Sequence, residues 1–71
     1  MIHFTKYAEE KFDLFHKYKV YLTREQVEDA VLLPDKTGKK NGYLTARKDN
    51  LKVIYKREGE IAKIITFFPV K

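Results

Sequence analysis

The stretch KTGKKNGYLTARKDNLKVIYKREGEIAKIITFFP, residues 36–69, decides the fold. Its apolar residues recur with the two-residue period of strands, and it contains three tight-turn signals: Asn41-Gly42, Asp49-Asn50 and Glu58-Gly59. Asn-Gly is the strongest of them, because a type I′ turn needs positive φ at both central residues. The spacing predicts an antiparallel meander of four strands, which span residues 36–40, 43–48, 51–57 and 61–68.

Alternation along the last two strands predicts which side chains are buried. In the third strand, the face that should pack on the rest of the protein holds Leu51, Val53 and Tyr55, and the open face holds Lys52, Ile54 and Lys56. In the fourth strand both faces are apolar: Ile61, Ile65 and Phe67 on one side, and Ala62, Ile64 and Phe68 on the other. Of these, we expect Ile64 and Phe68 to join Ile54 on the open face.

The first part of the chain has helical periodicity. One apolar stripe consists of Phe4, Ala8, Phe12 and Phe15, at steps of four, four and three. Thr5 is a suitable N-cap, so we expect a helix over about 6–18, with residues 1–4 extended before it. A flank of the same helix carries Tyr7, Lys11, Leu14 and Tyr18, where we expect boundary packing.

A second helix is indicated by its first turn, where Thr23 and Gln26 form a capping-box pattern. Pro34 disfavours helical geometry at the residue before it, so this helix should end near Leu32. The elements together predict one α+β domain over residues 1–71. Two N-terminal helices cover one face of a four-stranded antiparallel sheet, or of a five-stranded sheet if residues 1–4 add a strand.

Composition restricts the chemistry that the chain can perform. The 71 residues include no Cys, and the two His, His3 and His16, do not form a metal-ligand spacing. No apolar run approaches the roughly 18 residues of a membrane helix, and no signal-peptide pattern opens the chain. We therefore expect a cytoplasmic protein without cofactor or metal, whose function depends on a few surface side chains.

Charge is unevenly distributed along the chain. Residues 1–35 carry five basic and seven acidic side chains, a net charge of −2, whereas residues 36–71 carry ten basic and three acidic ones, a net charge of +7. This asymmetry favours a polyanionic partner for the strand-forming half, although Lys-rich strands are also a common means of solubility.

The order of elements and the run LKVIYKREGEIAKIITFFP (51–69) resemble the RelE/ParE toxin superfamily. A closer resemblance is to small, poorly characterised RelE-like domain families of the same fold. The matching segments are FTKYAEEKF (4–12), TREQVEDAVLLPD (23–35), VIY (53–55) and IITFFP (64–69). They span nearly the whole chain, but most are structural, so they support the fold more strongly than the activity.

The resemblance implies action on RNA or the translating ribosome, and an acidic antitoxin-like protein as a partner. Two departures concern catalysis. Tyr7 stands where the small-domain families often have His. FPVK (68–71) closes the sequence where ribosome-dependent nucleases of the superfamily carry further basic residues, His or Tyr. The resemblance therefore leaves open whether the chain is a ribonuclease of the mRNA-interferase type.

Candidate site residues lie on the basic strands. RNA cleavage by a 2′-hydroxyl needs positive charge near the phosphorane as well as proton transfer. We assign the electrostatic role to Lys52, which matches the basic strand position of the superfamily, and to Arg47, as predicted catalytic residues. The predicted RNA-binding residues are Lys39, Lys40, Tyr43 and Lys56. His3 reaches the open face if residues 1–4 edge the sheet, and His16 should be a surface residue.

Three functional hypotheses follow. The first is a RelE/ParE-like toxin or toxin-derived domain that acts on RNA. The second is a non-catalytic module that binds nucleic acid or an acidic protein through the same sheet face. The third is a homodimer that buries the apolar last strand between two copies.

Overall fold

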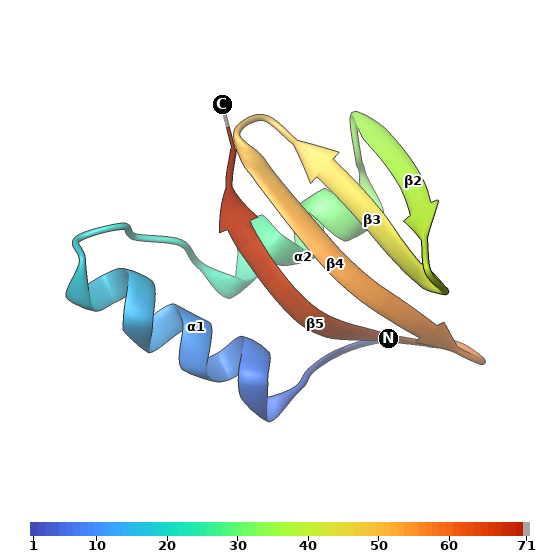
Figure 1. Ribbon diagram of the computed structural model, residues 1–71, viewed down its shortest axis with the longest axis horizontal. Helices are drawn as coiled ribbons and strands as arrows, with labels where there is room; N and C mark the ends of the chain where they lie inside the picture. Colours follow the sequence, from blue (N-terminus) through green and yellow to red (C-terminus); the bar gives the residue numbers. More distant parts are fainter. Residues whose placement is uncertain (71) are drawn as a thin grey trace.

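The computed structural model describes residues 1–70, and in that range it contains two helices and one five-stranded sheet (Figure 1). In chain order the elements are β1 (Ile2–Phe4), α1 (Lys6–Lys17), α2 (Arg24–Leu32), β2 (Lys36–Lys40), β3 (Tyr43–Lys48), β4 (Leu51–Glu58) and β5 (Ile61–Pro69). The strand order across the sheet is β1-β5-β4-β3-β2. The predicted α+β class, both helices and all four strands of the meander are confirmed.

The sheet is mixed, which corrects the expectation of an antiparallel sheet. β2 to β5 form the antiparallel meander, but β1 runs parallel to β5 as a fifth strand. Both ends of β1 are held. The Ala62 N–H donates to the Met1 carbonyl (2.8 Å), and the Thr5 N–H donates to the Ile64 carbonyl (3.2 Å). β1 thereby covers backbone groups of β5 that would otherwise form an open sheet edge.

Threonine caps begin both helices, as predicted. The Thr5 Oγ1 atom accepts a hydrogen bond from the Ala8 N–H (3.2 Å) at the start of α1. At the start of α2, Thr23 Oγ1 accepts from the Gln26 N–H (3.1 Å), and Gln26 Oε1 accepts from the Thr23 N–H (2.9 Å). These bonds satisfy donors that have no partner within the helix itself.

The two-residue turn at Asn41-Gly42 sets the register of the first hairpin. Asn41 has φ 51° and Gly42 has φ 82°, so both central residues occupy the left-handed region that a type I′ turn requires. Lys40 therefore pairs with Tyr43. Because a turn of fixed length fixes the register, the other pairs of β2 and β3 follow from this one.

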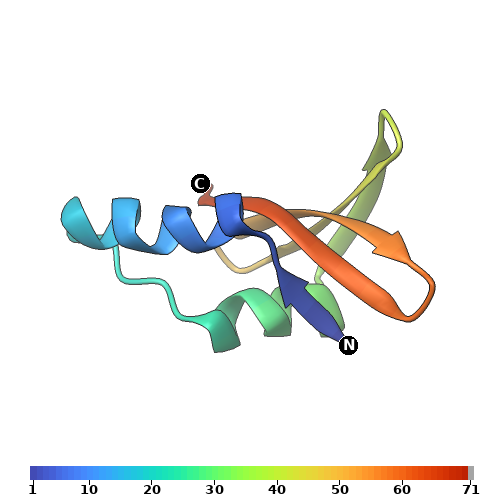
Figure 2. The same cartoon turned by 90° about the horizontal axis from the view of Figure 1, so that it is seen from below.

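The core lies between the helices and one face of the sheet. Figure 2 shows α2 beneath the sheet and α1 beside β5. The buried residues are Ala8, Val27, Ala30, Val31, Ala46, Leu51, Val53, Tyr55, Ala62, Ile64 and Phe67. The rings of Phe12 and Phe15 in α1 lie 4.5 and 5.9 Å from the ring of Phe67. The buried residues of both helices thus pack against one face of the sheet. No helix of residues 1–70 lies on the opposite face.

A β-bulge lies in β5, beside Ile54 and Tyr55 of β4. Ile54 pairs with Thr66, whereas the next residue, Tyr55, pairs with Ile64. Ile65 is therefore an extra residue without a partner of its own in the ladder. An inserted residue reverses the alternation of side chains for the rest of the strand.

The bulge changes which residues of β5 face the core. Phe67 joins Ala62 and Ile64 there, and Phe67 and Ile64 are both fully buried (0% exposed). Phe68 pairs with Lys52 and is half-buried on the other face. The prediction from strict alternation is therefore wrong for Ile64, which does not lie on the open face, and correct for Phe68.

Candidate nucleic-acid interface

The face of the sheet opposite the helices, here called the outer face, is defined by the strand register. Residues paired across two strands carry their side chains on the same face. The outer face comprises His3 of β1, Lys36, Gly38 and Lys40 of β2, Tyr43, Thr45 and Arg47 of β3, Lys52, Ile54, Lys56 and Glu58 of β4, and Ile61, Lys63, Thr66 and Phe68 of β5. Three rows of these residues cross the strands, and the pair Glu58 and Ile61 lies beyond them at the β4–β5 turn.

The first cation row consists of Lys36, Arg47 and Lys52. Lys36 lies opposite Arg47, and Arg47 lies opposite Lys52, on β2, β3 and β4. Neighbouring strands are about 4.8 Å apart, so three basic side chains arise within about 10 Å. Phe68 continues the row on β5. Like charges placed directly opposite one another destabilise a sheet, and a bound anion would relieve this repulsion.

The second cation row consists of Lys40, Lys56 and Lys63. Lys56 lies opposite Lys63. Tyr43 of β3 pairs with Lys40 of β2. The next residue, Leu44, pairs with Tyr55 of β4, so Tyr43 lies opposite Lys56 and therefore between the two lysines. On β4 the two cation rows are four residues apart, at Lys52 and Lys56, which corresponds to about 13 Å.

The central row between them carries short and uncharged side chains. Its members are Gly38, Thr45, Ile54 and Thr66. A Cβ atom on Gly38 would lie 2.9 Å from Thr45 Oγ1, so even alanine would require a shift here. The outer face therefore has a low, partly apolar centre flanked by two positively charged rows.

Acidic residues are mostly on the other layer of the molecule. Six of the ten acidic side chains belong to α1 and α2, and one of these, Glu9, forms an ion pair with Arg24 (2.6 Å). On the outer face itself, Lys63 Nζ lies 2.9 Å from Oε2 of the acidic Glu58. The pKa of Glu58 is lowered, first by the hydrogen bond from Lys63 and its charge, and further by the charge of Lys56.

Five of the six predicted site residues share the outer face. Arg47 and Lys52 are neighbours in the first cation row, and Lys40, Tyr43 and Lys56 lie in or beside the second. Lys39 does not belong with them. It pairs with Leu44, so its side chain lies on the opposite face of β2 from that of Lys40. Successive residues of a strand face opposite ways, so Lys39 and Lys40 cannot both line one surface.

Two basic members of the outer face, Lys36 and Lys63, were absent from the predicted site. The position of Lys36 could have been predicted from the Asn-Gly turn. A two-residue loop fixes the pairing of β2 with β3, and this pairing places Lys36 opposite Arg47. Lys63 lies next to Lys56 and, on the other side, opposite His3 of β1. His3 thus reaches the outer face, whereas His16 is exposed on α1 and contacts the ring of Tyr21 edge-on (4.9 Å).

The arrangement can perform two kinds of chemistry on a phosphate chain. The two cation rows can neutralise phosphates, and the planar guanidinium of Arg47 can donate hydrogen bonds to two oxygens of one phosphate. Proton transfer requires a side chain that can act as an acid or a base beside the phosphate. On the outer face, the imidazole of His3 lies opposite Lys63 and offers such a group.

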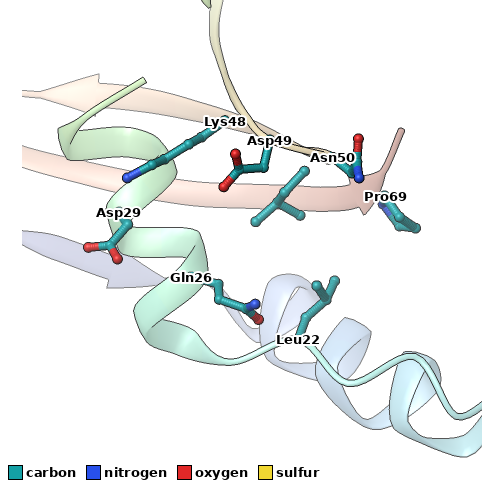
Figure 3. Close-up of a pocket in the computed structure, with 8 residues that line it drawn as sticks. Leu22, Gln26, Asp29, Lys48, Asp49, Asn50 and Pro69 are labelled. Atoms are coloured by element: carbon teal, nitrogen blue, oxygen red, sulfur yellow. The ribbon is translucent and has the colours of Figure 1, made fainter. Parts of the chain in front are cut away.

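A cavity of about 380 Å³ lies away from this face. Gln26 and Asp29 of α2 face Lys48, Asp49 and Asn50 of the β3–β4 turn across it, and Leu22, Leu51 and Pro69 complete the lining (Figure 3). Because α2 forms one wall, the cavity opens on the helical side of the sheet. It is therefore separate from the two cation rows.

Comparison of the chain with protein-family models, with curated proteins and with solved structures finds no match. Function must therefore be inferred from the residues of the site. Within residues 1–70, neither helix has the length and apolar character needed to cross a membrane.

Proposed function

We propose that the chain is a RelE/ParE-like toxin or toxin-derived domain that binds RNA, free or on the translating ribosome, through its outer face. The observation that carries the proposal is the pair of cation rows on a sheet face that neither helix of residues 1–70 covers. Six basic residues belong to these rows, and one of them, Lys63, forms an ion pair with Glu58. Such a surface attracts a polyanion over a distance and holds it by releasing counterions.

The side chains between the cations favour RNA over an acidic protein. Proteins that bind single strands combine a positive groove with aromatic rings on which bases stack. Tyr43 is 42% exposed beside the second cation row, and Phe68 is half-buried at the end of the first. The hydroxyls of Thr45 and Thr66 in the central row can contact ribose and base edges. A contact to the ribose 2′-hydroxyl would distinguish RNA from DNA.

Cleavage would be a further property of the same surface. Lys52 and Arg47 would stabilise the charge that develops on the phosphorane, as predicted from the sequence, and His3 would transfer protons. An acidic antitoxin-like protein, the partner that the resemblance implies, would neutralise the same cation rows and compete with RNA. Binding is the first property to test, because the chemistry depends on it.

The proposal is tested by the salt dependence of RNA affinity. We expect a short single-stranded RNA to bind through about three or four basic contacts, so the logarithm of the association constant should fall against log salt with a slope of about −2 to −3. Fluorescence anisotropy of a labelled oligonucleotide between about 20 and 200 mM salt measures this slope. No binding at the lowest salt would contradict the proposal.

We expect the substitution Glu58→Gln to strengthen RNA binding. It removes the carboxylate that pairs with Lys63, so one more cation becomes available and the salt slope should steepen by up to about 0.7. The effect also has a pH dependence. Because the pKa of Glu58 is lowered, its charge persists below the pH at which a free Glu is neutralised, and it is lost as pH falls through that lowered pKa.

Wild-type affinity should therefore rise toward the affinity of Glu58→Gln on acidification, and the difference between the two proteins should shrink. Glu25→Gln on α2 is the matched control, since it removes the same charge from the helical layer. Equal effects of the two substitutions would show that only net charge matters.

A further inference from the structure

α1 carries a second apolar stripe that the fold leaves uncovered. Its members, predicted from the sequence to be boundary packing, are Tyr7, Lys11 and Leu14 of α1 and Tyr18, the C-cap residue that follows the helix. The exposed fractions are 59% for Tyr7, 46% for Leu14 and 69% for Tyr18, so these side chains do not pack into the domain. Figures 1 and 2 show α1 at the side of the molecule, beside β5, with much of its surface free.

The spacing of this stripe is that of a coiled-coil seam. The four residues follow one another at steps of four, three and four, which are heptad positions d, a, d and a. Of the neighbouring e positions, Ala8 belongs to the core and Phe15 packs against it. α1 therefore presents one face to its own sheet and an adjacent seam to the outside.

A hollow of about 300 Å³ lies on this seam. It is lined by Tyr7, Glu10, Lys11 and Leu14, which are residues i, i+3, i+4 and i+7. Four residues with this spacing form the hole that receives one side chain of a facing helix in coiled-coil packing. The ammonium of Lys11 lies 5.0 Å from the ring centre of its own Phe15, so its charge is held by a cation–π contact.

The charges beside the seam indicate which helix fits. The two g positions are Glu10 and Lys17, both exposed and of opposite sign. In an antiparallel pair of helices the g positions face each other, whereas in a parallel pair they face e positions, which here pack against the core of their own domain. A second α1 laid antiparallel places Glu10 against the partner's Lys17 twice, as two-fold symmetry requires.

We propose that α1 is a self-association surface, on which the α1 of a second copy of this chain docks antiparallel. Tyr7 then packs on the partner's Tyr18, and Leu14 packs on the stem of the partner's Lys11. The seam is about 18 Å long, so the contact lies below the standard size of a stable interface and gives a weak, exchanging dimer. The helix is already formed in the monomer, so no folding cost opposes the contact. This surface is distinct from the outer face and from the last strand.

Sedimentation velocity over a concentration range of about 10 μM to 1 mM tests the proposal. The wild-type protein should shift from monomer toward dimer, and Leu14→Lys should remain monomeric. Leu32→Lys, at the exposed C-terminal end of α2, is the matched control and should dimerise as wild type does. Circular dichroism spectra that match the wild-type spectrum show that the variants are folded.

A charge exchange tests the antiparallel arrangement. Glu10→Lys alone and Lys17→Glu alone each create two like-charge pairs and should weaken self-association by about tenfold. A 1:1 mixture of the two variants restores both attractive pairs and should dimerise about as well as wild type. A mixture no better than either variant alone, a dimer that survives Leu14→Lys, or a wild-type protein that stays monomeric throughout would overturn the proposal.

Discussion

Lys52→Glu is expected to lower the affinity for single-stranded RNA by at least about tenfold at low salt, which corresponds to ~1.4 kcal/mol. Lys52 lies directly opposite Arg47 in the first cation row and opposite Phe68 on its other side. A carboxylate there removes one phosphate contact and also partly neutralises the neighbouring guanidinium. Both effects act on the same bound phosphates, so the loss exceeds that of a single deleted contact.

The control must change the net charge equally without changing the outer face. Lys6→Glu meets this requirement, because Lys6 is an exposed residue at the start of α1. Anisotropy titrations of the two variants at the same ionic strength give the comparison. If both variants lose affinity equally, net charge rather than the cation rows governs binding. If neither does, the outer face is not the RNA site.

Part of this site could be derived from the sequence, because its geometry is set locally. The Asn41-Gly42 turn fixes the pairing of β2 with β3, and alternation along β4 places Lys52 and Lys56 on one face. The same period excludes Lys39 from that face, although it is adjacent to Lys40. The sequence prediction combined the two lysines by their charge, and alternation along the strand separates them.

Other features depend on long-range contacts that no local pattern contains. The parallel pairing of β1 with β5 joins residues about sixty positions apart, as in the hydrogen bond between Met1 and Ala62. Helical and strand periods predicted that residues 1–4 are extended, but not which strand they pair with or in which direction. The position of Lys63 beside His3 is a consequence of that pairing.

The bulge in β5 could not be predicted from the sequence, because both of its faces are apolar. In a strand with one polar face, an extra residue is visible as a break in the alternation of polar and apolar residues. In IAKIITFFP (61–69), either Phe67 or Phe68 could fill the core by its apolar character. The registers with and without the bulge therefore differ only in how the ring packs. The distinction is carried by the rings of Phe12 and Phe15, which contact Phe67.

Phe67→Ala should therefore be the most destabilising single truncation in β5. Phe67 is fully buried, and its ring contacts two aromatic side chains of α1. Removing a buried phenyl ring costs about 3–5 kcal/mol. A domain of 71 residues is stable by only roughly 4–10 kcal/mol in total, so the variant should be largely unfolded or should unfold at far lower denaturant. Urea titration monitored by circular dichroism measures the change.

Phe68→Ala is the matched control, since it removes the same ring from the adjacent position. Phe68 is half-buried on the outer face beside Lys52, so its loss leaves no enclosed cavity and should cost much less. The order of the two effects tests the bulge directly. If β5 alternated strictly from Ile64, Phe68 would be the core residue and the order would be reversed. A Phe68→Ala variant less stable than Phe67→Ala would therefore contradict the register, and with it the placement of the first cation row.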